Sequence, residues 1–320
     1  LDGILVGPSA AAMRPIFAEA AGAASNAELS EDVREQAIAL LEYAGYDLAG
    51  PVLVSLVEAE PVQRLRLRAA SALAAHASPE VARVLLDNLR RQTPSVRRAM
   101  LDGLLVNPER TGLLLDDIAA GKIRAAELDP LQAGRLLKHP DAGLRARAAE
   151  LLAAATPADR AKALAEYRAA LDLKADPLRG KEIFKKTCTT CHRIGELGVD
   201  VAPSIADSRT KTQEQLLIDI LQPSKAIDNN YVSYSVITAD GQSLVGIIAA
   251  ETASSVTLKM PDNKVVSLLR EEIEDIRSNG ISLMPDGLER GLSRQDMADL
   301  ISFIKNWRYL ESDVPARAGK

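Results

Sequence analysis

Two patterns of hydrophobic and polar positions divide this chain. Up to about residue 172, apolar residues recur three or four positions apart between breakers, which predicts amphipathic helices. Between about residues 231 and 278 they alternate in short runs, which predicts β-strands. We therefore expect a mainly α protein whose second half carries a small sheet.

The helical half contains an internal repeat. Four segments share an apolar-Arg-x-x-small motif, with arginines 32, 31 and 48 residues apart: Arg34, Arg66, Arg97 and Arg145. Each copy follows a breaker or capping element, such as Thr93-Pro94, that places proline near a first helical turn. Helix pairs at a near-constant period predict a stacked array.

Over about residues 8–172 this pattern resembles short bacterial HEAT-like repeats, which implies an α-solenoid. Such an array could offer a curved docking surface for a protein, or act as a spacer or cap for the following domain, and both interpretations stay open. The repeat arginines are expected to bond neighbouring carbonyls or acids. His76 and His139 close helices, where a positive charge is favourable, so capping explains them better than metal binding.

The string Cys188-Thr-Thr-Cys191-His192 carries the clearest chemistry. Two thiols three positions apart can form thioethers to one porphyrin, and the adjoining imidazole can reach its iron. A redox dithiol would sit in a βαβ context, and a zinc site would need two further ligands, neither of which is visible. One covalent haem c is therefore predicted, with His192 as an iron ligand.

Composition narrows the classes of function. The 320 residues are 47% hydrophobic, and 39 basic against 44 acidic residues give a net charge of -5, which argues against a nucleic-acid partner. No apolar run reaches membrane-spanning length. The chain begins at Leu1, so we expect a mature or excised fragment. Because haem is joined to such motifs outside the bacterial cytoplasm, we expect a periplasmic or otherwise exported protein whose export signal is not present in this chain.

Two helices are expected to cross around the motif. One begins at Asp176-Pro177 and delivers Cys188, with Gly180 and Phe184 on one face. The other begins after the N-cap Ser293 and runs through Phe303 to Trp307. This layout resembles class I cytochrome c, which implies that Gly180 and Phe184 contact Phe303 and Trp307 and that the aromatic rings line a haem pocket.

The loop from Gly198 to Ile205 resembles the Gly-x-x-x-Gly-Pro-x-Leu loop of the same cytochromes. The resemblance implies that the Pro203 carbonyl accepts the Nδ1–H of His192 and thereby raises its basicity. Ala202 stands where the family has glycine, which puts the path of the loop in doubt. Arg209 could bond a haem propionate or simply start a helix.

Three methionines after the motif are candidates for the second iron ligand. Met260 ends an alternating strand, and Met297 lies inside the last helix at a packing position. Met284 lies in the loop before that helix, where these cytochromes place the ligand, so we favour Met284 over Met260. Lys185 and Lys186, near the attachment site, could orient an acidic partner, but a solvated helix face explains them more simply.

Two hairpins, at 231–250 and 255–269, and a further strand at 273–278 predict a small antiparallel sheet or barrel. We place a helical repeat domain at 1–174 and a cytochrome c domain at 175–320, with a β insertion at about 230–278. The insertion explains why the favoured methionine lies so far beyond His192.

This layout resembles the haem-binding cytochrome c domain of planctomycetes and verrucomicrobia, which often follows HEAT-like repeats in large proteins with a domain assigned as a membrane-bound dehydrogenase. The matching residues are Gly180, Cys188 to His192, Leu221 to Lys225, Asp240-Gly241, Val245 to Ile247, Ser282 to Pro285 and Asp299-Leu300. The resemblance implies an electron carrier that serves a redox protein partner or a fused dehydrogenase and is not by itself an enzyme. The alternative is a haem-based ligand sensor with an exchangeable Met284; a peroxidase would need a distal His and Arg pair, which is not evident.

Overall fold

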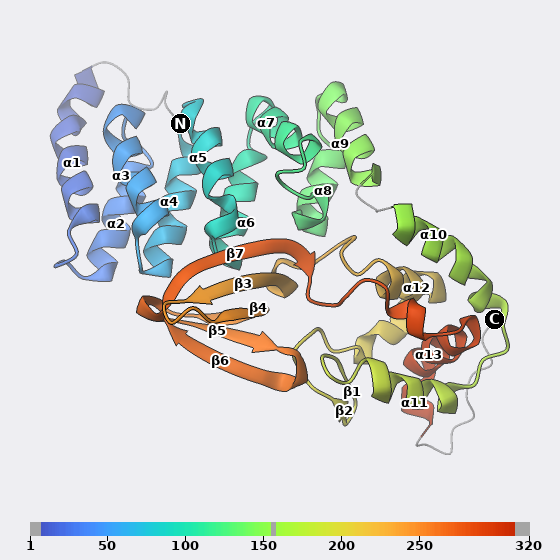
Figure 1. The fold of residues 1–320 in the computed structure, drawn as a ribbon. Helices are drawn as coiled ribbons and strands as arrows, with labels where there is room; N and C mark the ends of the chain where they lie inside the picture. Colours follow the sequence, from blue (N-terminus) through green and yellow to red (C-terminus); the bar gives the residue numbers. More distant parts are fainter. Residues whose placement is uncertain (1–7, 155–157, 311–320) are drawn as a thin grey trace.

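The computed structural model describes residues 8–154 and 158–310 (Figure 1). The helices are α1 (Pro8–Ser25), α2 (Glu31–Leu41), α3 (Tyr46–Ala59), α4 (Gln63–Ala75), α5 (Glu80–Asn88), α6 (Pro94–Leu104), α7 (Pro108–Ala119), α8 (Pro130–Leu137), α9 (Ala142–Ala154), α10 (Ala158–Tyr167), α11 (Pro177–Thr187), α12 (Gln213–Leu221) and α13 (Arg294–Asn306). The strands are β1 (Arg193–Ile194), β2 (Leu197–Gly198), β3 (Val232–Thr238), β4 (Ser243–Glu251), β5 (Ser255–Met260), β6 (Lys264–Leu269) and β7 (Ile273–Ser282). The protein is thus mainly helical with a sheet, as the patterns predict.

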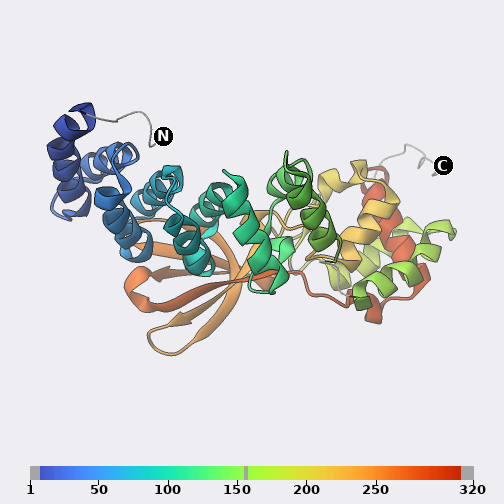
Figure 2. The same ribbon diagram turned by 90° about the horizontal axis from the view of Figure 1, so that it is seen from above.

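Helices α1 to α9 form one layer around a continuous hydrophobic core (Figures 1 and 2). Leu53, Leu73 and Leu85 are completely buried in it. Burying each such side chain contributes about 1.5–3 kcal/mol relative to leaving it in water. Seen from above, the helices follow one another in a row from the N-terminal end towards the C-terminal helices (Figure 2). The HEAT-like assignment of this layer stays a prediction.

The repeat arginines bond within the helical layer, as expected. Arg34 donates from Nε to the Ala24 carbonyl at 3.0 Å and forms a buried ion pair with Glu60. The remaining contacts follow the same rule: Arg66 donates to the Glu60 carbonyl, Arg97 pairs with Glu127, and Arg145 donates to the His139 and Pro140 carbonyls. These side chains tie consecutive turns and helices together.

The two histidines of this layer make local contacts that differ from simple capping of their own helices. The His76 Nε2 atom lies 3.1 Å from the carbonyl of Leu41, the last residue of α2, so it serves a neighbouring helix end. The Nδ1 atom of His139 accepts the Asp141 N–H at 3.1 Å, just before α9. Both contacts are structural.

The five larger strands form one antiparallel sheet in the order β6-β5-β4-β3-β7. The predicted strand positions are confirmed, and β7 runs four residues further than expected. One face of the sheet buries Tyr234, Val236 and Leu258. The hydroxyl of Tyr234 donates to the Gln92 carbonyl at 3.2 Å, so the sheet packs directly on the helical layer.

A third core lies between α11, α12 and α13. Leu164 and Tyr167 of α10 and the following Ala170 belong to this core, although the predicted boundary at 174/175 assigns them to the repeat domain. The Tyr167 hydroxyl lies 2.8 Å from the Glu289 carbonyl and contributes to the same packing. Helix α10 therefore packs with the C-terminal helices rather than with α1 to α9.

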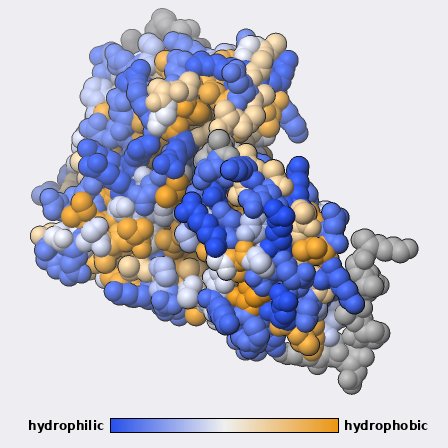
Figure 3. Space-filling view, turned by 45° about the vertical axis from the view of Figure 1, so that its right-hand side comes forward, coloured by the Kyte–Doolittle hydropathy of each residue, from blue (hydrophilic) through white to orange (hydrophobic). Residues whose placement is uncertain are grey.

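On the face drawn in Figure 3, hydrophobic residues gather in several patches separated by hydrophilic side chains. Within residues 8–154 and 158–310, no helix combines the length and apolar character needed to cross a bilayer.

Candidate functional site

Helix α11 positions the cysteine motif. Its N-cap Asp176 accepts the backbone N–H of Leu178 at 2.9 Å, and Pro177 occupies the first turn. The helix ends at Thr187, and the N–H of the following Cys188 donates to the Phe184 carbonyl at 2.8 Å. Two further bonds turn the chain back at once, because the N–H groups of Cys191 and His192 both donate to the Cys188 carbonyl. Both thiols and the imidazole therefore lie within one turn of the helix end.

The predicted crossing of α11 and α13 is present. A Cβ atom on Gly180 would lie 2.0 Å from the Asp299 carbonyl oxygen, so only glycine permits this approach. The rings of Phe184 and Phe303 lie 5.4 Å apart between centroids and are tilted by 53°, and both residues are buried. This contact fixes the helix that carries the motif.

Trp307 packs against the turn that follows the cysteine motif. Its indole N–H donates to the Ala206 carbonyl at 3.2 Å, and its ring lies against Gly195, where a Cβ atom would be 2.9 Å from Cζ3. The predicted contacts with Gly180 and Phe184 are thus made by Phe303, whereas Trp307 holds the β1–β2 turn just after His192. Trp307 still packs at the edge of the same core.

The Nδ1 atom of His192 lies 2.8 Å from the Pro203 carbonyl oxygen. Because a carbonyl can only accept, Nδ1 carries the proton and Nε2 keeps a free lone pair. Burial lowers the pKa of His192, and the bond to Pro203 opposes that shift. The imidazole is therefore neutral at neutral pH, the form that binds a metal.

The loop around Pro203 is held to the motif by backbone bonds. The N–H groups of Val201 and Ala202 both donate to the Cys191 carbonyl, at 3.1 and 2.8 Å. Alanine in place of the expected glycine is therefore compatible with the predicted path. Gly198 in the same loop has a φ of 86°, and a Cβ atom there would lie 2.0 Å from the His192 carbonyl oxygen.

The Cys188 thiol does not have the character of a redox thiol. Both cysteines are free and half-buried. Burial raises the pKa of the Cys188 thiol to about 12, with a smaller contribution from Cys191. Redox and nucleophilic cysteines need a lowered thiol pKa, so the burial of Cys188 disfavours that alternative.

The candidate methionines lie in different settings. Met284 is half-buried in the loop after β7, and its N–H donates to Ser282 Oγ at 3.1 Å. Met260 ends β5, and its Cγ atom lies 3.1 Å from the position of a Cβ on Gly246. Met297 is completely buried in α13, at the predicted packing position.

Of the polar candidates, Arg209 has a buried Nε atom that finds no hydrogen-bond partner among the described residues. A buried guanidinium donor without an acceptor calls for an anion beside it. Lys185 and Lys186 are exposed, and Lys185 donates to Glu182 at 2.7 Å, which fits a solvated helix face.

Two contacts between the inserted sheet and the region of the cysteine motif were not predicted from the sequence. The turn between β5 and β6 reaches the motif, because the Asp262 N–H donates to the Thr190 carbonyl at 2.8 Å. Lys259 adds a bond from Nζ to the Asp200 carbonyl, also at 2.8 Å. The Pro261-Asp262-Asn263 string marks a turn in the sequence, but nothing local indicates what that turn touches.

The residues present fit a covalently attached haem. Two free thiols lie beside a neutral imidazole of assigned tautomer, and the unpartnered Arg209 donor suits a propionate. A covalently attached haem would use the two thiols, the lone pair on His192 Nε2 and the Nε–H of Arg209.

Comparison with known proteins agrees with this chemistry. The family model of cytochrome c matches residues 178–308, a range that includes the cysteine motif, Met284 and α13. A search of curated proteins found no match. The cytochrome c family carries covalently bound haem c. Residues 178–308 therefore form a cytochrome c domain, a haem-binding unit for electron transfer.

Proposed function

We propose that this protein carries one haem c with His192 and Met284 as axial ligands and passes single electrons to and from a redox partner. The observation that carries the proposal is the 2.8 Å contact from His192 Nδ1 to the Pro203 carbonyl, beside two free thiols at the end of α11. When bound, the haem supplies the one-electron chemistry.

The polypeptide has three tasks in this proposal. Cys188 and Cys191 hold the group through thioethers, and Pro203 keeps the His192 ring in the tautomer whose Nε2 faces the iron. Arg209 offers its unpartnered Nε–H to a propionate. The tight crossing of α11 and α13 keeps these groups in fixed positions, so little rearrangement accompanies a change of charge.

Met284 is the proposed second ligand because two consecutive hydrogen bonds hold the start of its loop. Ser282 Oγ accepts the Met284 N–H, and the Ser282 N–H donates in turn to Ser224 Oγ, both at 3.1 Å. Met260, in contrast, lies in β5 and pairs with Lys264 of β6. A thioether ligand favours reduced iron and suits an electron carrier.

We further propose that the chain is the electron-accepting module of a larger exported dehydrogenase of the planctomycete type. The support is the order of its parts, a helical layer followed by a cytochrome c domain with an inserted sheet. The sheet packs against the helical layer where Tyr234 bonds to Gln92, so it covers part of the helical surface. A protein partner would dock on the remaining helical surface.

The test is to produce the chain in an exporting host with haem-attachment machinery and to measure its mass and its pyridine haemochrome spectrum. We expect the mass of one haem and a reversible one-electron couple. Cys188→Ala should lose one of the two thioether bonds, and Thr190→Ala, at the exposed position between the cysteines, should behave like the parent. An unmodified polypeptide under these conditions would overturn the proposal. A reduced spectrum that changes with carbon monoxide would favour the sensor alternative instead.

A further inference from the structure

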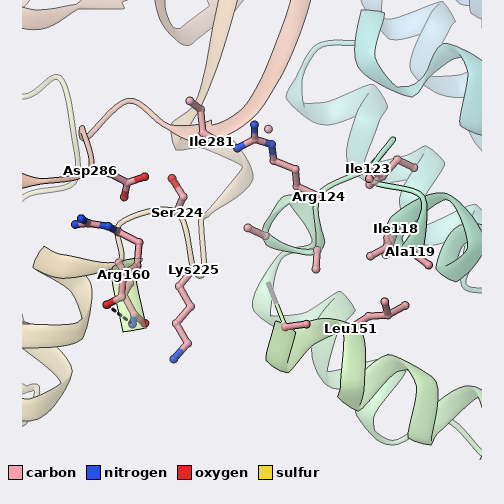
Figure 4. Close-up of a pocket in the computed structure, with 16 residues that line it drawn as sticks. Ile118, Ala119, Ile123, Arg124, Leu151, Arg160, Ser224, Lys225, Ile281 and Asp286 are labelled. Carbon is pink, nitrogen blue, oxygen red and sulfur yellow. Dashed lines mark hydrogen bonds between the residues drawn. The ribbon is translucent and has the colours of Figure 1, made fainter. Parts of the chain in front are cut away.

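A cavity of about 410 Å³ lies between the helical layer and the cytochrome c domain (Figure 4). The end of α7, the loop after it and α9 form one wall. The segment 222–225 and residues on both sides of Met284 form the other. Its size falls within the range of small-molecule sites, and neither part of the protein encloses it alone.

Apart from Arg124, the side chains that the helical layer contributes to the cavity are mostly apolar. Ile118, Ile123 and Leu151 lie on the right of Figure 4, across the cavity from the polar side chains of the other wall. These apolar side chains suit a hydrocarbon or aromatic group.

The charges around the cavity favour an anion. Arg124 and Lys225 line it, and neither has a carboxylate within ion-pair distance in the described part of the chain. Arg160 is already neutralised by Asp159 at 3.1 Å and Glu289 at 2.8 Å. Asp286 is the one carboxylate among the described lining residues, so the two cations leave an excess of positive charge.

A buried acceptor adds a further requirement. Gln222 lines the cavity and is only 5% exposed. Its Nε2 donates to the Arg160 carbonyl at 3.4 Å, whereas its Oε1 has no partner among the described residues. Leaving such an acceptor unsatisfied costs about 1–3 kcal/mol, which a donor on a ligand would recover.

The geometry points to a binding site for a small hydroxycarboxylate with an apolar body. Its carboxylate would bind Arg124, its hydroxyl would donate to Gln222 Oε1, and its apolar part would cover Ile118, Ile123 and Leu151. The site is separate from the cysteine motif and does not depend on the haem.

Its consequence for the haem rests on the proposed function. Ile281 and Asp286 line the cavity and flank Met284 in the chain, and Ser224 both lines it and accepts the Ser282 N–H. A bound ligand would therefore stiffen the loop that carries the proposed iron ligand. We expect the reduction potential to change when the cavity is filled.

The test is titration calorimetry of the full haem-loaded chain with mandelate and 3-phenyllactate as probes. Methyl mandelate lacks the charge and phenylacetate lacks the hydroxyl, so each removes one proposed contact. We expect one saturable site, weaker binding of both analogues, and a dissociation constant raised at least about tenfold by Arg124→Gln, the loss of one charge-assisted bond. Arg83→Gln, an exposed arginine on α5 that does not line the cavity, is the matched control and should bind like the parent.

Absence of saturable binding for both hydroxycarboxylates would overturn the inference, as would equal binding of mandelate and its methyl ester. Circular dichroism of each variant shows that it is folded before it is titrated. Calorimetry needs no electron transfer, so its result is independent of the proposed redox role. Binding without any change in reduction potential would contradict the link to Met284 alone.

Discussion

The backbone N–H of Asp262 donates to the carbonyl oxygen of Thr190 at 2.8 Å, so the β5–β6 turn is bonded to one of the two residues between the cysteines. Asp262 and Asn263 adopt left-handed backbone conformations, with φ values of 60° and 59°. Aspartate and asparagine tolerate this region, whereas β-branched residues do not. The inserted sheet is therefore anchored at the cysteine motif by a turn of specific composition.

Asp262→Val should destabilise the protein by about 1–2 kcal/mol, because valine must be forced into the left-handed region. Asp262→Asn, which tolerates the same φ, is the matched control and should change the free energy of unfolding by less than about 0.5 kcal/mol. Denaturant unfolding measures both, and hydrogen exchange of the residue 262 amide reports the bond to Thr190. Equal stability of the two variants would show that the turn does not hold this conformation.

Gly180→Ala should destabilise the protein by about 3 kcal/mol, since the new methyl group would meet the Asp299 backbone 2.0 Å away. The backbone of α13 cannot yield without opening the Phe184–Phe303 contact. Gly134→Ala in α8 is the control, because a Cβ there meets nothing within 4 Å, and it should stabilise the helix by about 0.5–1 kcal/mol. Thermal unfolding that ranks the two variants in the opposite order would contradict the crossing.

Arg97→Met should destabilise the protein by about 3–5 kcal/mol, because it leaves the buried Glu127 carboxylate without its partner. Both side chains of this pair are 1% exposed. Arg14→Met removes the exposed pair with Asp47 and should cost less than about 1 kcal/mol. Chemical denaturation of both variants tests the difference, and a mild effect of Arg97→Met would mean that Glu127 finds another way to be neutralised.

Met284→Ala should convert the haem from six-coordinate low-spin to five-coordinate high-spin and open it to carbon monoxide. Met260→Ala removes a thioether of the same size from the end of β5 and should leave the spectrum unchanged. Absorption spectra of the oxidised and reduced proteins distinguish the two. The reverse result would make Met260 the ligand and would place the β insertion directly over the iron.

Short sequence patterns predicted the cysteine motif, the helix caps and most of the strands of this protein. The cysteine spacing and the helix capping by Asp176 and Ser293 depend on residues a few positions apart. The alternation of hydrophobic and polar residues in strands such as β5 is equally local. The contact of His192 with Pro203 could also be predicted from the sequence, because both residues belong to a short segment with a recognisable motif.

Only the tertiary structure decided which distant segments meet. Residues 72 positions apart, Thr190 and Asp262, are joined by backbone groups, which leave no mark on side-chain identity. The packing of α10 with the C-terminal core and the cavity beside Gln222 likewise depend on how whole layers pack. Hydrophobic burial is non-directional, so a sequence specifies which faces are buried more readily than which partners bury them.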